Sequence, residues 1–320
     1  SLNKVSREFD YTQSYFELNN DEVNPDEVNS NDYNTVKIHD PSSFVTSDQM
    51  VNGVYLQNSH HVKKFDIFYG ARLENTNQYI KYVDQLQFYN RTINNINMNL
   101  LPNAGVKYNV GKSVLRASYS NTITRPRFRE LVPFEYTQFF AGTKMRGNPY
   151  LENSVSSNVD ISYEYYPRAG ELYNVNVFYK NIQDPIEMIY LPTASGRLLT
   201  FENSDVANIY GIELEAKKKV KQFVFDFNTS LLYSVVNVDN LNNIATNTKR
   251  PLQGSVPFIL NFDVLYEFKS STIGLIFNRT GDRLVTFGVQ GMGDVYQNPM
   301  NNMNFVYIKE FKSLIAQIKV

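Results

Sequence analysis

The chain has 320 residues, a formal net charge of −1 and no cysteine. The near-neutral charge argues against a nucleic-acid partner, and the lack of cysteine excludes disulfides, thiolate metal sites and cysteine nucleophiles. No apolar run approaches the roughly eighteen residues that a transmembrane helix needs, so a membrane protein of this sequence would have to be a β-barrel. The 23 tyrosines and 22 phenylalanines favour β-structure.

The N-terminal region opens with a weak strand pattern around Phe9 and Tyr11. A polar stretch follows at residues 19–48, with carboxylates at Asp21, Glu22, Asp26, Glu27 and Asp32. Two interpretations stay open for these carboxylates, a solvated acidic loop and a calcium site. They lack the spacing of a known calcium-binding loop, which favours the solvated loop.

Residues 53–62 and 65–74 predict the first clear hairpin. The second arm alternates, with an apolar face formed by Phe65, Ile67, Tyr69, Ala71 and Leu73. His60 and His61 precede its turn, and adjacent strand residues point to opposite faces. We therefore interpret them as strand-end histidines rather than as joint ligands of one metal ion.

The clearest hairpin spans residues 154–180 and turns at 167–170. Apolar side chains occupy the odd positions of both arms and polar ones the even positions, which is the period of a β-strand. Each arm has about ten alternating residues, close to what a tilted strand needs to cross a bilayer. We expect the odd-numbered face to contact lipid.

Connections between strands alternate in length. Short ones are predicted at residues 60–64, 109–112, 167–170, 217–221, 269–272 and 311–313, and long ones at 19–48, 75–91, 124–153, 185–203, 237–255 and 279–302. Antiparallel strands send successive connections to opposite ends of a sheet, so short turns gather at one end and long loops at the other. This is typical of outer-membrane barrels. Alternation alone equally suits a soluble β-sandwich, but the loop asymmetry and strand length favour the membrane interpretation.

One stretch resembles a known family. Residues 118–134 read SYSNTITRPRFRELVPF and residues 146–151 read RGNPYL, which is similar to a signature of TonB-dependent outer-membrane receptors. Further matches follow the order expected for that family: YGARLE at 69–74, FYKNI at 178–182 with PIE at 185–187, YGIELE at 210–215 and RPLQG at 250–254.

The resemblance implies a fold, a location and partners. Members of the family form a barrel of about 22 strands closed by an N-terminal plug. They import large nutrients such as iron chelates, cobalamin, glycans or peptides with energy from the TonB complex. It implies an outer-membrane location in a Gram-negative cell, contact with the lipid bilayer, a nutrient ligand at the extracellular loops, and a TonB complex reached through a plug.

This chain shows no plug-like segment, and its patterns give about thirteen strands. It also stops before the closing strand that the family usually has. We therefore expect residues 1–320 to form a single domain, a partial all-β, antiparallel transmembrane β-barrel that is the C-terminal portion of a receptor barrel. No cofactor and no metal are expected.

The sequence leaves two alternatives to an importer open. One is a self-contained passive porin or adhesin-type barrel. The other is an enzyme, for which Glu213 and Glu215, about 7 Å apart on one strand face, have a spacing that glycosidases can use. Charged lining of a wet lumen explains this pair more simply, and no nucleophile motif accompanies the three histidines, so we expect no enzymatic activity.

Ligand contact is predicted in the long loop of residues 125–151. Its cations are Arg125, Arg127, Arg129, Lys144 and Arg146, and its aromatic residues include Phe134, Tyr136, Phe139, Phe140 and Tyr150. Cations beside aromatic faces suit an anionic chelate or a sugar ring. Residues 125–134 also admit a purely structural role, so Tyr136, Phe139, Phe140 and Lys144 are the residues predicted to face the ligand.

Overall fold

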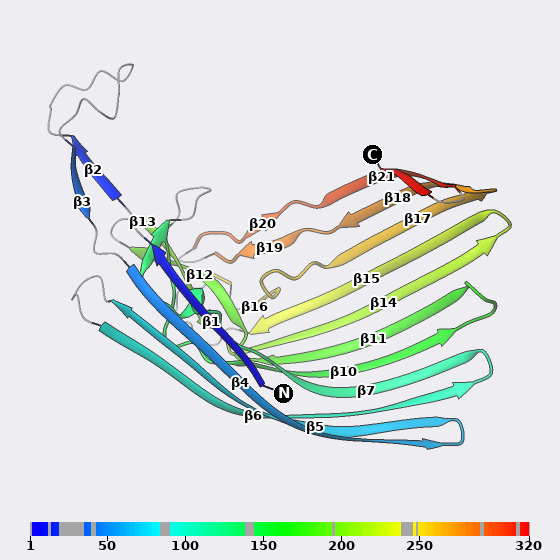
Figure 1. The fold of residues 1–320 in the computed structure, drawn as a ribbon, viewed down its shortest axis with the longest axis horizontal. Coiled ribbons are helices and arrows are strands. Elements are labelled where there is room, and N and C mark those ends of the chain that lie inside the picture. The colour runs from blue at the N-terminus through cyan, green and yellow to red at the C-terminus, as the bar shows by residue number, and fades with distance from the viewer. Residues whose placement is uncertain are drawn as a thin grey trace.

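The computed structural model describes residues 2–11, 14–18, 35–39, 43–83, 90–137, 144–193, 196–237, 246–247, 249–288, 291–311 and 314–319. Fourteen of its strands form one antiparallel sheet that curves around a concave side without closing on itself (Figure 1). The all-β fold and the partial barrel are confirmed. The polar stretch predicted as a loop at residues 19–48 is only partly described: residues 19–34, which hold its carboxylates at 21–32, lie outside the described residues, whereas residues 35–39 and 43–48 belong to strands.

The wall of the sheet is a meander in which strands adjacent in the sequence are paired, once the loop strands are set aside. Its strands are β1 (Leu2–Tyr11), β4 (Ser43–Val62), β5 (Phe65–Val83), β6 (Asn90–Val110), β7 (Ser113–Thr124), β10 (Ser154–Tyr165), β11 (Leu172–Gln183), β14 (Val206–Val220), β15 (Phe223–Asn237), β17 (Phe258–Phe268), β18 (Ser271–Thr280), β21 (Met300–Phe311) and β22 (Leu314–Lys319). The short β16 (Lys249–Arg250) pairs with β15 outside this path.

The predicted asymmetry of the connections is confirmed for five of the six short turns. Tight turns join β4 to β5, β6 to β7, β10 to β11, β14 to β15 and β17 to β18, and all of them lie at one end of the sheet (Figure 1). The sixth turn, between β21 and β22, lies outside the described residues. The described parts of the long connections lie toward the opposite end.

Several segments that the sequence predicted to be irregular are strands. The expected loop at residues 75–91 is mostly wall, because β5 continues to Val83 and β6 begins at Asn90. The expected loop at 185–203 is a hairpin of β12 (Ile186–Thr193) and β13 (Gly196–Asn203). Other loop elements are β2 (Ser14–Leu18), β3 (Thr35–His39), α1 (Phe128–Leu131), β8 (Glu135–Thr137), β9 (Lys144–Arg146), β19 (Arg283–Thr286) and β20 (Val295–Gln297).

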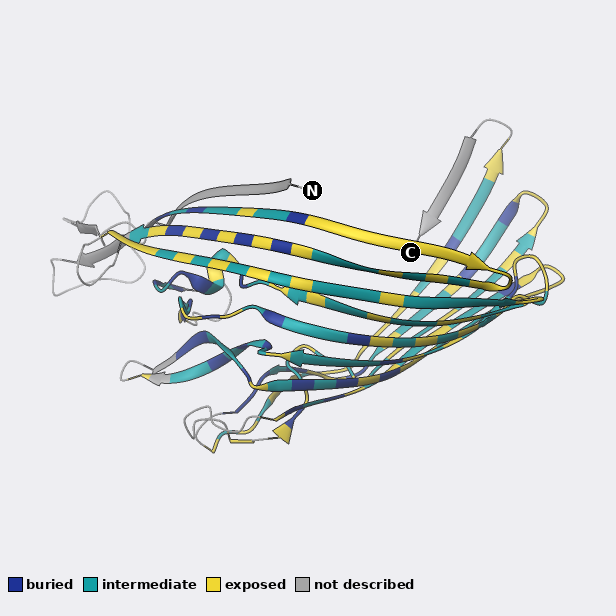
Figure 2. Ribbon diagram, turned by 90° about the horizontal axis from the view of Figure 1, so that it is seen from below, coloured by how far each residue is buried: buried dark blue, intermediate teal, exposed yellow. Residues whose placement is uncertain are grey.

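The two faces of the wall differ as the alternation predicts. On the outer face Ile161 pairs with Val177, which pairs with Ile212, and all three side chains are exposed (Figure 2). A row of tyrosines crosses the same face, with ring centroids 5.0 Å apart for Tyr179 and Tyr210. Contact of this face with lipid stays a prediction. No described helix has the length and apolar character to span a membrane.

The inner face is mostly polar and includes two cross-strand pairs of an aromatic ring with a glycine. Phe178 pairs with Gly211 and Phe68 with Gly105, and in both pairs the ring occupies the space that a glycine Cβ would fill. Glycine at these positions lets a large inner-face side chain lie flat on the neighbouring strand.

Candidate functional site

The segment that follows β7 folds inward and anchors on β5. The Arg125 guanidinium donates to Thr76 Oγ1 over 2.8 Å and pairs with the Glu74 carboxylate. Gln78 Nε2 donates to the carbonyl oxygen of Pro126 over 2.9 Å. These β5 side chains are buried and alternate along one face of the strand, so the wall itself provides the platform for the loop.

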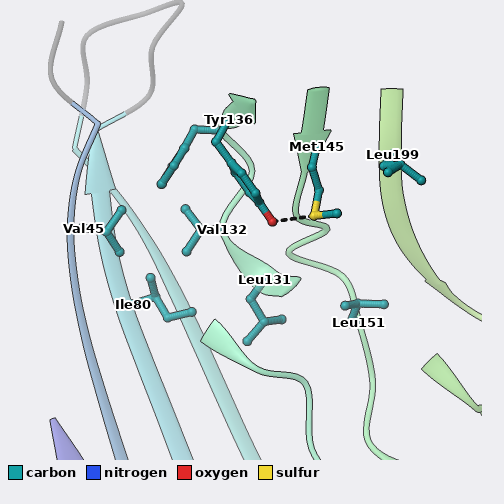
Figure 3. Close-up of a cluster of buried hydrophobic side chains, with 9 residues drawn as sticks. Val45, Ile80, Leu131, Val132, Tyr136, Met145, Leu151 and Leu199 are labelled. Carbon is teal, nitrogen blue, oxygen red and sulfur yellow. Dashed lines mark hydrogen bonds between the residues drawn. The ribbon is translucent and has the colours of Figure 1, made fainter. Parts of the chain in front are cut away.

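Beyond this anchor the loop forms a hydrophobic core with the wall. Leu131, Val132 and Phe134 are buried, and they pack against Val45 of β4 and Ile80 of β5 (Figure 3). Such packing gives the buried residues of 125–134 the structural role that the sequence had left open, whereas Arg127 and Arg129 are exposed.

Tyr136 belongs to the same core. Its side chain is 5% exposed and its hydroxyl donates to Met145 Sδ over 2.6 Å (Figure 3). The guanidinium carbon of Arg129 lies 4.3 Å from the ring centroid, on its way to the surface. Burial raises the pKa of the Tyr136 hydroxyl, while Arg129 acts in the opposite direction. Both the ring and the hydroxyl of Tyr136 are therefore in contact with protein groups.

Lys144 lies on β9, which pairs with β8, and its side chain is on the face of this pair opposite to that of Met145. Its side chain is 51% exposed and its Nζ is 3.5 Å from Glu135 Oε2. In the ladder between β8 and β9, Lys144 is opposite Thr137 while Met145 is opposite Tyr136. Two of the four predicted residues thus occupy adjacent strands, one inside the core and one at the surface. Phe139 and Phe140 lie outside the described residues.

The hairpin of β12 and β13 continues the wall hairpin of β11 and β14 through a corner. Asp184 adopts a positive φ of 51° there, and its N–H donates to the carbonyl oxygen of Asp205 over 3.1 Å. Beyond the corner β13 pairs in parallel with β9, and Asn148 Nδ2 donates to the carbonyl oxygen of Phe201. The sheet β12-β13-β9-β8 joins the two loops into one unit on the concave side (Figure 1).

A buried ion pair joins this hairpin to the loops on the other side. Arg250 and Glu187 are each 1% exposed and pair through two bonds, Nη1 to Oε1 over 2.8 Å and Nη2 to Oε2 over 2.7 Å. The Gln253 N–H also donates to Glu187 Oε1, and the Arg250 guanidinium carbon lies 3.8 Å from the ring centroid of Phe287. A buried charge pair needs such added contacts to offset its desolvation.

Gln253 extends the same junction to a third loop. Its side-chain amide accepts from the N–H of Met188 over 2.6 Å and donates to the carbonyl oxygen of Val285 over 2.5 Å. Ile189 packs on Phe287 in a second small apolar cluster. We refer to the described residues of α1, β8, β9, β12, β13, β16, β19 and β20 as the loop layer, because these contacts make them one connected structure.

Glu187 belongs to the PIE motif at 185–187, and Arg250 and Gln253 belong to the RPLQG motif at 250–254. The sequence alone assigned no role to these three residues. Arg250 is 63 positions from Glu187, and Gln253 is 66 positions from it. No local sequence pattern therefore predicts these contacts. The side chains of the loop layer leave Arg127, Arg129 and Lys144 exposed while the aromatic Phe134 and Tyr136 are buried. The layer thus presents cations toward solvent.

The family model described as TonB dependent receptor-like, beta-barrel matches residues 3–305. A search of curated proteins found no match. Three similar solved structures are the FrpB iron transporter of Neisseria meningitidis, the ferric yersiniabactin uptake receptor FyuA of Yersinia pestis, and the ferric enterobactin receptor PfeA of Pseudomonas aeruginosa in complex with enterobactin.

The structural likeness concerns the fold. FrpB has a TM-score of 0.56 at 13% identity over 83% of this chain and 39% of its own. FyuA has 0.59 at 15% over 84% and 39%, and PfeA has 0.53 at 12% over 85% and 48%. The chain therefore spans less than half the length of these three proteins.

Proposed function

Since this chain belongs to the TonB-dependent receptor β-barrel family, we propose that it forms part of the wall and loop layer of an active nutrient importer. The importer lies in the outer membrane of a Gram-negative cell, and a plug links it to the TonB complex. Residues 1–320 are one partial barrel domain of it. The imported nutrient is a large anionic molecule, of which an iron chelate is the first candidate.

The observation that carries the proposal is the segregation of side chains in the loop layer. Two aromatic residues of the predicted contact loop, Phe134 and Tyr136, lie in its core, whereas the cations Lys144 and Arg129 are exposed, as is the aromatic Tyr150. Exposed cations on a rigid base suit a ligand that carries several negative oxygens, since charge-assisted hydrogen bonds are stronger than neutral ones. Two of the similar solved structures are named as receptors for the iron chelates ferric yersiniabactin and ferric enterobactin, which is consistent with this ligand class.

The four residues predicted to face the ligand divide into two roles in this proposal. Lys144 contacts the ligand through its charge, and Phe139 and Phe140 provide apolar contact. Tyr136 positions β9, which carries Lys144, because its hydroxyl bond to Met145 ties β8 to β9.

Uptake of radioactive iron by cells with the intact receptor tests the transport role. Ferric enterobactin and ferric yersiniabactin serve as probes. We expect accumulation of at least one of them to require both the receptor and TonB. Accumulation that persists without TonB would contradict active import and support a passive porin.

Binding of the transported chelate to purified receptor tests the contact residues. Lys144→Gln should weaken binding roughly tenfold or more, because a charge-assisted hydrogen bond is lost. Glu135→Gln is the matched control, since it removes only the partner of Lys144 and leaves the cation available. Unchanged binding in Lys144→Gln, at a normal amount of folded receptor, would place the site in other loops or in the plug.

A further inference from the structure

The tight-turn end of the sheet carries a concentration of basic residues. Lys63 and Lys64 form the turn between β4 and β5, and Lys269 opens the turn between β17 and β18. The remaining basic residues at these turns are Lys112, Arg168, Lys217, Lys218, Lys219 and Lys221, so each of the five described turns has at least one. The turns all lie at one end of the wall (Figure 1), so we refer to these nine basic residues together as the basic rim.

Most of this rim has no acidic partner. Lys219 pairs with Glu267 over 2.5 Å, Lys217 lies 3.5 Å from Asp226, and Lys112 Nζ donates to the carbonyl oxygen of Pro167. Within the described part of the chain, no ion pair or hydrogen bond reaches the remaining basic side chains, which are exposed: Lys63, Lys64, Arg168, Lys218, Lys221 and Lys269. Their charge is available to a partner outside the chain.

Three of these lysines occupy a backbone conformation that does not favour lysine. Lys63, Lys221 and Lys269 have positive φ angles of 57°, 55° and 50°. Glycine and asparagine adopt this region more readily, and the turn between β6 and β7 does use Gly111, with φ of 57°. Since the geometry alone would select glycine or asparagine, the recurrence of lysine indicates a role for its charge.

The surroundings of the rim indicate which partner this is. Aromatic rings adjoin the turns, as in the Phe65 and Tyr108 stack with centroids 4.4 Å apart and the Phe223 and Tyr266 pair at 4.9 Å. Phe65, Phe223 and Tyr266 are exposed on the outer face. Such rings mark the level where the apolar part of a membrane meets its headgroups. The lysines lie just beyond, where a flexible stem lets the ammonium group reach a lipid phosphate.

We propose that this basic rim binds the anionic headgroups of phospholipids in the membrane leaflet at the tight-turn end. The proposal rests on the membrane location inferred above, in which this end faces the periplasm. It concerns how the barrel is held in the leaflet, and it is independent of which nutrient is imported.

Reconstitution of the intact receptor tests the rim without any transport step. The receptor is placed in vesicles of phosphatidylcholine alone or of phosphatidylcholine with phosphatidylglycerol. Association of a spin-labelled phosphatidylglycerol with the protein is compared with that of spin-labelled phosphatidylcholine. We expect the wild type to prefer the anionic lipid. Removal of each rim lysine should lower local binding of the headgroup about fivefold. The preference should also fall at high salt.

The decisive variant replaces Lys63, Lys221 and Lys269 with asparagine, which tolerates positive φ. In phosphatidylcholine its melting temperature should equal or exceed that of the wild type, which also shows that it folds. Its preference for phosphatidylglycerol should be strongly reduced. The same three positions changed to arginine should retain the preference, since the charge is kept.

Two double variants distinguish the charge of the rim from backbone strain and from cations elsewhere on the chain. Lys64→Gln with Lys218→Gln, at positions of ordinary φ, should reduce the preference without a change of backbone strain. Lys249→Gln with Arg283→Gln, at exposed positions of the loop layer, should leave it intact.

The proposal is overturned if the asparagine variant retains the full preference. It is also overturned if glycerol phosphate in solution competes as well as the lipid, which would identify a simple anion site. Binding of the receptor to peptidoglycan sacculi, without any preference among lipids, would overturn it as well and would identify the cell wall as the partner of the rim.

Discussion

At the scale of single residues, the Glu187 and Arg250 pair places two opposite charges inside the loop layer. Both side chains are almost fully buried, and they bond to each other and to a few fixed groups, although Arg250 Nε has no hydrogen-bond partner within the described residues. Removing one partner leaves a buried charge without compensation. The free energy that this costs is far larger than the net stabilisation that the intact pair provides. The pair therefore acts as a junction whose loss should release the β12 and β13 hairpin from the loop that contains Arg250.

The first prediction follows from this junction. Arg250→Ala should lower the free energy of local opening by about 3–5 kcal/mol. Amide hydrogen exchange of residues 186–204 in the intact receptor measures this quantity. Arg283→Ala, which removes an exposed arginine bonded to Gln297, should change it by less than about 0.5 kcal/mol. Equal protection in the two variants would show that the hairpin is held by its apolar contacts alone.

A second prediction concerns Glu202, which is opposite Glu187 in the hairpin ladder. Burial raises the pKa of the Glu202 carboxyl above its ordinary value of 4.5. An acid with a raised pKa contributes stability that is complete below the ordinary value and is lost as the pH rises through the raised one. Glu202→Gln should therefore make the loop layer more resistant to opening at neutral pH.

The same exchange measurement across pH tests the sign. The advantage of Glu202→Gln over the wild type should shrink as the pH falls through the raised pKa toward 4.5, and should be lost below 4.5, where the wild-type carboxyl is neutral in both states. An advantage that stays constant with pH would assign the effect to something other than the charge of Glu202.

At the scale of elements, the sequence predicts wall strands well where one face is apolar and the other polar. The arms at residues 154–165 and 172–183 match this pattern closely. The prediction stopped short at Glu74, because β5 beyond it carries polar residues such as Asn75 and Asn77 on one face and buried Thr76 and Gln78 on the other. Pairing of the backbone continues there without an apolar alternation to reveal it.

The hairpin of β12 and β13 escaped prediction for a different reason. Its strands are covered by protein on both faces, so the apolar residues from Met188 to Leu191 run continuously instead of alternating. The candidate site shows the same limit. Sequence identified the loop and its cations, but Tyr136 was predicted to face the ligand because nothing local shows that Met145 and Leu131 enclose it.

The third prediction assigns the two faces of the hairpin of β10 and β11. Tyr163→Arg and Val177→Arg should each destabilise membrane assembly of the intact receptor by about 2–4 kcal/mol, because they place a charge on the lipid face. Ser162→Arg and Asn176→Arg should be tolerated, since Asn176 already donates to Glu213 on the inner face. Heat-dependent gel mobility of the barrel, compared among the four variants, measures assembly. Equal tolerance of both pairs would contradict the assignment of faces.

At the scale of the whole molecule, the curved wall has a partly unpaired edge. Strand β1 pairs with β4 only from Ser43 to Asn52. From Gly53 to Val62, β4 pairs with β5 alone within the described residues, and Val54, Tyr55 and Leu56 are 77%, 65% and 73% exposed (Figure 2). An extended, apolar strand edge of this kind is a template for pairing with another chain.

The last prediction is that residues 1–320, expressed alone and refolded in detergent, self-associate through this edge and form no conducting channel. A bilayer cannot hydrate the unpaired backbone groups of an open edge, so the isolated wall gains stability only by covering them with another copy. Size-exclusion chromatography with light scattering measures the association, and planar-bilayer recording measures conductance. Leu56→Lys should shift the population toward the monomer, because charge on an edge strand discourages pairing.

Leu115→Lys is the matched control for this edge. Leu115 is also exposed on the outer face, but its strand β7 is paired on both sides, with β6 and β10. Leu115→Lys should therefore place a charge in the detergent-covered face at the same free-energy cost as Leu56→Lys, but it should not reduce self-association. Monodisperse monomers of the unmodified chain that conduct ions would contradict the prediction, because an open wall cannot sustain a channel, and would favour a self-contained porin.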